Sequence, residues 1–123
     1  MQIIETTKAP VAIGPYSQGV CVNGFVYTSG QIPVEPDTGA IPEGITAQAE
    51  QSCKNVGAIL EAAGVSFANV CKTTCFLANM EDFAAFNQVY ARYFISKPAR
   101  SCVAVKDLPK GVLCEIEAIA IVP

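Results

Sequence analysis

Arg100 and Cys102 stand two residues apart in the segment 98–103, so in an extended strand their side chains share one face. Arginine presents a planar fork that grips a carboxylate through two parallel hydrogen bonds. Charge-assisted hydrogen bonds contribute roughly 1.5–3 kcal/mol, enough for one arginine to anchor a small acid. The alternative is an interface salt bridge from Arg100 to a glutamate such as Glu115 or Glu117. Residue chemistry alone favours the salt bridge.

Four other positions carry groups that could take part in chemistry. Cys102 is a nucleophile or a small apolar filler, and only Arg100 lies near enough in sequence to lower the pKa of its thiol. Glu117 lies between two apolar residues. It is either a base that orients water, or a carboxylate on the solvent-exposed surface. Tyr16 lines a pocket or covers an edge. Ser29-Gly30 allows a ligand close to the backbone or simply ends a strand.

The chain has no histidine, which excludes a Ser-His-Asp triad and a Cys-His pair. Proton transfer is left to carboxylates, tyrosine, lysine, thiols and bound water. No metal site is expected, because Cys71 and Cys75 are not backed by a second cysteine pair or by histidine. Free thiols, mostly buried, are expected for Cys21, Cys53, Cys71, Cys75, Cys102 and Cys114.

Composition narrows the class of protein. The net charge is −3 and the chain contains no basic block, so no nucleic-acid partner is expected. No apolar window is long enough to span a membrane, and residues 1–5 do not resemble a secretory signal. A cytoplasmic location is therefore expected. Charged residues make up only 15% of the sequence, which hints that an oligomer hides part of the surface.

A single domain over residues 1–123 is expected, since no linker, repeat or low-complexity tract divides the chain. Two apolar runs, 20–22 and 25–28, flank Asn23-Gly24, the strongest short-range signal for a β-hairpin. Residues 31–44 are rich in proline and glycine and are predicted to form a loop.

Two helices are predicted from apolar periodicity. The first begins at Thr46 as capping residue and ends before Gly64. Its apolar stripe consists of Ala49, Cys53, Val56, Leu60 and Ala63. The second begins at Asn79, which forms a capping-box pattern with Asp82, and ends near Ile95. Its stripe consists of Phe83, Phe86, Val89, Tyr90 and Tyr93.

Further strands are predicted at 69–78, 101–105 and 113–122. With the hairpin they give the order β-β-α-β-α-β-β. This order predicts an α+β fold (an α/β sandwich) with both helices on one face of a mixed sheet. The other face of the sheet then needs a different partner.

The last predicted strand has two unlike faces. One face suits a helix-covered core and consists of Cys114, Ile116, Ala118 and Ala120. The opposite face consists of Leu113, Glu115, Glu117, Ile119 and Ile121. That second face is too apolar for open water and yet carries two carboxylates. Two explanations fit this pattern equally well. One is a subunit interface that contains a polar pocket, and the other is a solvated rim on which both glutamates are exposed.

Six short segments, taken together and in order, resemble the RidA/YjgF family of enamine and imine deaminases. They read IGPYSQ at 13–18, YTSGQIP at 27–33, VCKTT at 70–74, PARSCV at 98–103, LPKG at 108–111 and EIEAIA at 115–120. Each segment alone is a weak signal, but together they span nearly the whole chain.

The resemblance implies a chorismate-mutase-like fold. Three subunits would join their sheets into a central barrel, with the helices outside and the active sites in clefts between subunits. The implied activity is hydrolysis of 2-aminoacrylate, 2-iminopropanoate or 2-iminobutanoate to a 2-keto acid and ammonia. A protonated imine is already electrophilic, so the resemblance implies neither a cofactor nor a metal.

The resemblance also implies residue roles. Arg100 would bind the substrate carboxylate, and Glu117 would position or activate the attacking water. Tyr16 would close the pocket from a neighbouring subunit. The residues implied to line the pocket are Ser29, Gly30, Asn87 and Cys102.

Three features depart from the usual family pattern. Lys97 stands where an aromatic residue often precedes the Pro-Ala-Arg motif, the segment 94–98 is short, and Ala104 replaces a glutamate of some members. These features leave the preferred imino acid open. Two alternatives to the deaminase also stay open, a carboxylate-binding regulatory trimer and the chaperone or endoribonuclease activities attributed to relatives. The acidic charge and the missing histidine argue against the ribonuclease.

Overall fold

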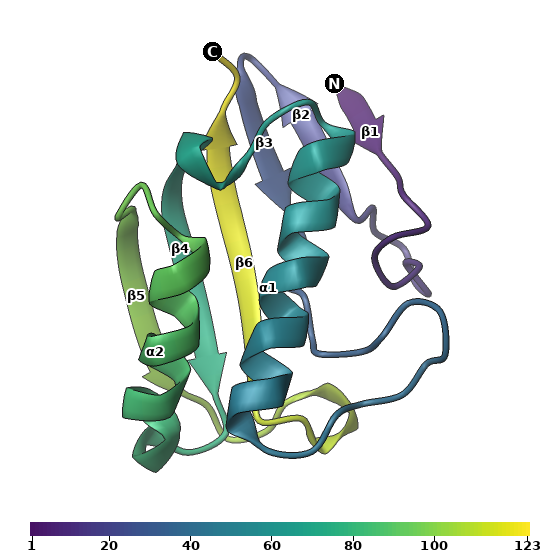
Figure 1. Cartoon of the computed structure of the whole chain (residues 1–123). Coiled ribbons are helices and arrows are strands. Elements are labelled where there is room, and N and C mark those ends of the chain that lie inside the picture. Colours follow the sequence, from purple (N-terminus) through teal and green to yellow (C-terminus); the bar gives the residue numbers. More distant parts are fainter.

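The computed structural model describes residues 1–123 as two helices packed on one face of a six-stranded mixed sheet (Figure 1). The elements are β1 (Gln2–Ile4), β2 (Gly19–Val22), β3 (Phe25–Thr28), α1 (Ile45–Ala62), β4 (Val70–Leu77), α2 (Phe83–Tyr93), β5 (Ala99–Ala104) and β6 (Cys114–Ile121). The strand order across the sheet is β1-β2-β3-β6-β4-β5. The predicted α+β class, with both helices on one face, is confirmed.

The connections determine which strands form the edges of the sheet. β4 and β5 are parallel neighbours joined through α2, whereas β6 is antiparallel to both β3 and β4. β6 is therefore inserted between two strands that α1 connects, which is a split β-α-β arrangement. β5 pairs only with β4 and forms one edge, and α2 lies beside it in Figure 1.

The hairpin between β2 and β3 confirms the Asn-Gly prediction. Asn23 and Gly24 have φ values of 51° and 79°, as a type I′ turn requires, and Val22 pairs with Phe25 across the turn. β1 was not predicted. It is only three residues long and pairs with β2 at the other edge of the sheet, so it carries too little alternation to be recognised.

The core lies between the two helices and the sheet. Both predicted helix stripes face it, and of the ten stripe residues only Ala63, Phe83 and Tyr93 are half-buried rather than buried. The alternation predicted for β6 is also confirmed, because Cys114, Ile116, Ala118 and Ala120 are all buried against the helices. Burying each large apolar side chain contributes roughly 1.5–3 kcal/mol.

The predicted start of the first helix was wrong. The N-cap is Gly44, with φ 86°, and no side chain caps this end, while the exposed Thr46 already lies inside α1. The predicted C-terminus is confirmed: Gly64 has φ 80°, and the N–H of Val65 donates to the Leu60 carbonyl as in a Schellman motif.

The polar residues Gln48 and Asn55 are buried on α1, although the apolar stripe does not include them. Asn55 donates to the carbonyls of Ile32 and Val34, and Gln48 donates to the carbonyl of Pro42. Buried backbone carbonyls need such partners. These bonds hold the loop 31–44 against the helix.

The predicted start of the second helix was also partly wrong. The side chain of Asn79 accepts from the N–H of Glu81 and caps a short 3-10 helix, Met80–Asp82, that precedes α2. Asp82 forms no capping bond, and α2 ends at Tyr93, two residues before the predicted Ile95.

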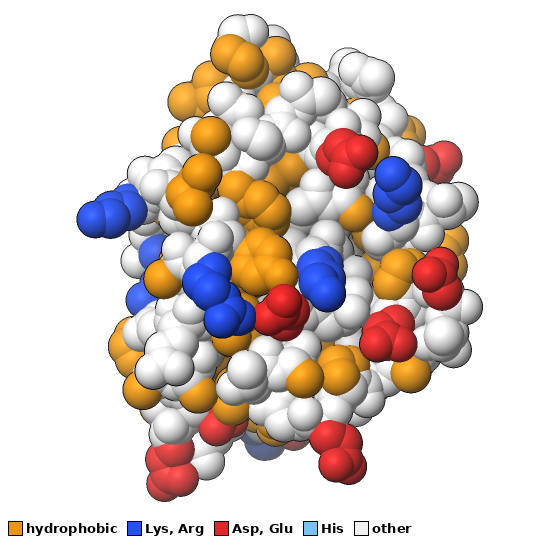
Figure 2. All heavy atoms as spheres, in the orientation of Figure 1, with side chains coloured by type: hydrophobic (Ala, Val, Ile, Leu, Met, Phe, Trp, Pro, Cys, Tyr) orange, Lys and Arg blue, Asp and Glu red, His pale blue; other side chains and the backbone are white.

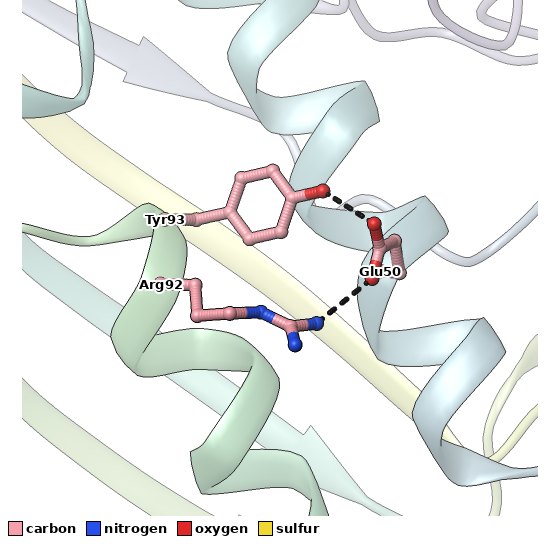
Figure 3. A network of polar contacts seen from close by, with 3 residues as sticks. All are labelled: Glu50, Arg92 and Tyr93. Atoms are coloured by element: carbon pink, nitrogen blue, oxygen red, sulfur yellow. Dashed lines mark hydrogen bonds and ion pairs between the residues drawn. The ribbon is translucent and has the colours of Figure 1, made fainter.

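Glu50 on α1 joins the two helices (Figure 3). Its carboxylate accepts a hydrogen bond from Arg92 at 3.0 Å and another from the Tyr93 hydroxyl at 2.9 Å, both on α2. Burial and this hydrogen bond to the carboxylate raise the pKa of Tyr93 to about 12. The network fixes the position of α2 over the sheet.

The face of the sheet without helices is rich in exposed apolar side chains. It includes Ile3, Phe25, Tyr27, Val103 and Ile121, each at least 39% exposed. On the helix-covered face, by contrast, charged side chains of both signs are interspersed with hydrophobic ones (Figure 2). Neither helix has the length and apolar character needed to cross a membrane.

Candidate active site

Arg100 points to the helix-covered side of the sheet. It is the second residue of β5 and pairs in register with Thr73 on the parallel strand β4. Thr73 is buried under α2, where its hydroxyl and that of Tyr90 form a hydrogen bond of 2.7 Å. Because register partners in a sheet share a face, Arg100 lies beneath α2 at the edge of the sheet.

Three side chains of α2 hold the guanidinium of Arg100. Asn87 accepts a hydrogen bond from Nη1 at 2.7 Å. The guanidinium carbon lies 4.6 Å from the ring centre of Tyr90 and 5.5 Å from that of Phe83. Spacings of four and three residues bring Phe83, Asn87 and Tyr90 onto one face of the helix. We call these three residues the arginine cradle.

Arg100 forms no ion pair within the chain, whose two salt bridges are Lys8–Glu61 and Arg92–Glu50. Arg100 thus forms no salt bridge to Glu115 or Glu117 of its own chain. An interface salt bridge to a neighbouring chain stays a prediction. One N–H of the guanidinium bonds to Asn87, and the other N–H groups have no acceptor in the chain. These groups are available to a carboxylate.

Arg100 lines an open groove of about 490 Å³. The other lining residues come from the second half of α2 and the loop that follows it: Asn87, Tyr90, Ala91, Phe94, Ile95, Lys97 and Pro98. No aspartate or glutamate lines this groove, and its size suits a small organic acid.

Cys102 shares the helix-facing side with Arg100 and packs against the core. Burial raises the pKa of its thiol, although the nearby Arg100 opposes this shift. A thiol with a raised pKa is a poor nucleophile at neutral pH. This favours the role of a small wall residue for Cys102 over covalent catalysis. All six cysteines are free thiols, and Cys53, Cys75 and Cys114 are buried.

A second group of candidate residues centres on Glu115 and Gly30. The carboxylate of Glu115 lies directly over Gly30, in the space that a β-carbon at position 30 would occupy. Burial, and then the charge of the neighbouring Glu117, raise the pKa of Glu115. The Gly30 N–H takes part in no backbone hydrogen bond outside the helices and strands. The glycine is thus required by the close approach of a carboxylate.

The sheet itself creates this contact. Two pairs, Tyr27–Ile119 and Gln31–Ile116, bracket this region. Between them, one chain segment has three residues (28–30), whereas β6 has only two (117 and 118). The extra residue is a bulge, and bulges re-aim side chains next to functional sites. Glu117, by contrast, is exposed.

Ser29 and Tyr16 lie next to this group. The Ser29 hydroxyl donates to the carbonyl of Ser17 and so ties the Tyr16 loop to the end of β3. The buried Gln18 anchors the preceding segment through hydrogen bonds with Thr6, Ala9 and Pro10. Tyr16 and Gly30 line the same cavity of about 220 Å³. The side chain of Tyr16 is itself 53% exposed.

The predicted site residues thus form two separate groups. The arginine half-site consists of Arg100, Asn87 and Cys102 on the helix-covered side of the sheet. The glutamate half-site consists of Glu115, Gly30, Ser29 and Tyr16, with Glu117 nearby on the open face. Within one chain the structure does not bring the two half-sites together.

Three residues of the arginine cradle and the glutamate half-site had not been predicted as functional. Phe83 and Tyr90 were predicted only as core residues, although their spacing from Asn87 could have indicated a common face. Glu115 was named as a possible salt-bridge partner and as one of two carboxylates on the second face of the last strand, but not as a catalytic residue. The sequence signal that could have favoured it is the Ser29-Gly30 pair, since a glycine at the end of a strand permits a close approach.

Comparison with known proteins decides the family. Residues 6–122 match the family described as Endoribonuclease L-PSP. The 2-iminobutanoate/2-iminopropanoate deaminase of Salmonella typhimurium is 53% identical over 122 residues, which cover 96% of this chain and 95% of that protein. The chain belongs to the RidA/YjgF family.

Other members of the RidA/YjgF family match this chain over nearly its whole length, in sequence and in fold. A RutC family protein of Haemophilus influenzae is 55% identical over 98% of this chain and 96% of its own length. The crystal structure of Escherichia coli TdcF with bound serine is 51% identical, with a TM-score of 0.95 over 98% of each chain. The family's fold therefore holds along nearly the whole length of the chain.

Proposed function

We propose that this protein hydrolyses reactive 2-imino acids and their enamine tautomers to 2-keto acids and ammonia in the cytoplasm. The substrates proposed are 2-aminoacrylate, 2-iminopropanoate and 2-iminobutanoate. The deaminase name of a relative with 53% identity supports the reaction type. The serine bound to E. coli TdcF, itself a small amino acid with a carboxylate, supports the class of ligand.

The observation that carries this proposal is the Arg100 guanidinium, which the arginine cradle holds in place without any carboxylate partner. An arginine preorganised in this way loses little entropy when it binds an anion. In the proposed complex it grips the substrate carboxylate through two hydrogen bonds and fixes the position of the imine carbon.

The chemical step is the hydrolysis of the bound imine. A water molecule adds to the carbon of the protonated imine and forms a carbinolamine, which then expels ammonia and leaves the keto group. The proposed base is a carboxylate of the glutamate half-site. Glu115 is better placed for this role than Glu117, because it is half-buried, has a raised pKa and lies against Gly30.

The two half-sites would meet between subunits of a homotrimer. The open sheet face, with exposed Phe25, Tyr27 and Val103, is the apolar surface that such an assembly would bury. β5 is an edge strand, so Arg100 lies where a neighbouring subunit can reach it. A neighbouring chain would then supply Tyr16, Ser29, Gly30 and the catalytic carboxylate.

The direct test generates 2-aminoacrylate in situ with a pyridoxal-phosphate-dependent dehydratase and follows its disappearance with and without this protein. Faster loss of the enamine with the wild-type protein is expected. Arg100→Ala should lower kcat/KM by about ten- to a hundred-fold, the range that lost charge-assisted hydrogen bonds imply. Arg92→Ala is the matched control, since it removes the other arginine, which lies outside the groove and is bonded to Glu50.

A carboxylate-binding regulator without catalysis is the second candidate, and the unpaired Arg100 also favours it. The two candidates differ in one result. A regulator would bind pyruvate saturably, and Arg100→Ala would weaken this binding, while the wild-type protein would not accelerate the loss of 2-aminoacrylate. This combination would establish the regulator and reject the deaminase.

A further inference from the structure

The groove at Arg100 contains a second cation, Lys97, that the proposed reaction does not use. Both cations line the groove, and no aspartate or glutamate lines it. Lys97 forms no salt bridge within the chain. Within one chain, a groove with two unpaired positive charges and no negative one attracts a ligand with two negative charges.

The backbone at Lys97 is unusual. Its φ is 52°, in the left-handed region, which few residues other than glycine adopt. It also directly precedes Pro98, a position at which residues are normally extended. A conformation of this kind persists only where the surroundings impose it, and it favours a functional reason for the residue that adopts it.

Two hydrogen bonds hold this turn. The N–H of Lys97 donates to the carbonyl of Phe94 at 3.2 Å. The hydroxyl of Ser96 donates to the carbonyl of Val70 on β4 at 2.7 Å. The lysine is thereby held three residues before Arg100, at the rim of the same groove. Its flexible four-carbon stem allows the ammonium group to reach ligands of different lengths.

Part of the groove wall is apolar. Ala91, Phe94 and Ile95 line it, and Ile95 is 66% exposed. Such a wall accommodates the methylene groups of a short carbon chain, while each end of the chain requires a polar partner.

Resting on the proposed function, we propose that Lys97 makes this site selective for dicarboxylic 2-imino acids, those with the carbon skeleton of an acidic amino acid. Arg100 binds the carboxylate next to the imine, and Lys97 binds the carboxylate at the other end of the substrate. A monocarboxylic imino acid uses Arg100 alone. Lys97 therefore determines specificity and takes no part in the chemical step.

The test compares 2-iminoglutarate and 2-iminopropanoate, generated in situ by amino-acid oxidases from glutamate and alanine. The readout is the ratio of kcat/KM for the dicarboxylic over the monocarboxylic substrate. Lys97→Met should lower this ratio by about five-fold, the effect of one exposed ion pair, and Lys97→Glu should lower it further. The matched control Lys106→Met, a lysine outside the groove, should leave the ratio unchanged. An unchanged ratio in Lys97→Met, or an equal loss with both substrates, would overturn the inference.

A binding measurement separates this inference from the proposed function. If the wild-type protein accelerates hydrolysis of neither substrate, the deaminase proposal fails, and titration calorimetry with 2-oxoglutarate and pyruvate then tests Lys97. Weaker binding of 2-oxoglutarate alone to Lys97→Met supports selectivity for two carboxylates. Equal affinity of both proteins for 2-oxoglutarate rejects it.

Discussion

Arg100 and Glu117 lie on opposite faces of the same sheet. Arg100 pairs with Thr73, which is buried under α2, whereas Glu117 pairs with Thr74, the next residue along β4. Successive residues of a strand point to opposite faces, so the two side chains diverge. Glu115 lies on the same face as Glu117, two residues before it. A site that uses an arginine and a carboxylate together is therefore incomplete in one chain.

The arginine cradle leads to a prediction about Tyr90. Tyr90→Leu removes the ring from beneath the guanidinium and should raise KM about three- to thirty-fold with little change in kcat, the range expected for a lost cation–π contact. Tyr90→Phe keeps the ring and should restore KM. It loses the hydrogen bond to Thr73, which should lower the free energy of unfolding by about 1 kcal/mol. Steady-state kinetics and denaturant titration measure the two effects. Equal KM values for the Phe and Leu variants would mean that Tyr90 only fills the core.

The two carboxylates of β6 should differ in their effects. Glu115→Gln should lower kcat about a hundred-fold or more, as expected when a general base is removed. Glu117→Gln should lower it much less. A larger loss in the Glu117 variant would assign the base to that residue instead.

The pH dependence gives an independent test of the same residues. Activity requires the ionised base and should rise with pH through the pKa of Glu115, which burial and the charge of Glu117 raise above the ordinary value of 4.5. Glu117→Gln removes the like charge, so it should shift the acidic limb of the kcat/KM profile to lower pH. A shift to higher pH, or none, would contradict the coupling of the two carboxylates.

The Glu50 network should contribute to stability and not to specificity. Glu50→Ala leaves the half-buried Tyr93 hydroxyl without its acceptor and should lower the free energy of unfolding by about 1–2 kcal/mol. The pKa of Tyr93 is raised from 10.0 to about 12 in the folded protein, so its contribution to stability is present below pH 10 and is lost as the pH rises towards 12. Denaturant titrations of wild type and Tyr93→Phe at pH 8, 10 and 11.5 would show this difference. A stability difference that does not depend on pH would refute it.

Local patterns were sufficient to predict most of the fold. Alternation in β6, the apolar stripes of both helices and the Asn23-Gly24 turn depend on residues near one another in sequence, and the structure has all three. The burial of Asn55 was not predictable in this way, because its partners are the carbonyls of Ile32 and Val34, 23 and 21 residues earlier. Gln48 donates to the nearby Pro42 carbonyl, but it also accepts from the N–H of Leu113, 65 residues later.

The site was predictable only in part. The motif around Arg100 indicated this residue as a candidate, but its cradle depends on how α2 packs over β5. Glu115 and Glu117 are both flanked by apolar residues, so sequence could not choose between them. The bulge at Ser29-Gly30 distinguishes them, because it brings Gly30 beneath Glu115 alone.

The shared site makes a direct prediction about mixed trimers. Arg100→Ala and Glu115→Gln subunits, each of low activity, are unfolded together in equal amounts and refolded. Random assembly of a three-fold ring gives about a quarter of the interfaces an intact Arg100 from one chain and an intact Glu115 from its neighbour. The mixture should therefore recover roughly a quarter of the wild-type activity on 2-aminoacrylate. Activity no higher than the average of the two variants refolded separately would contradict a site shared between subunits.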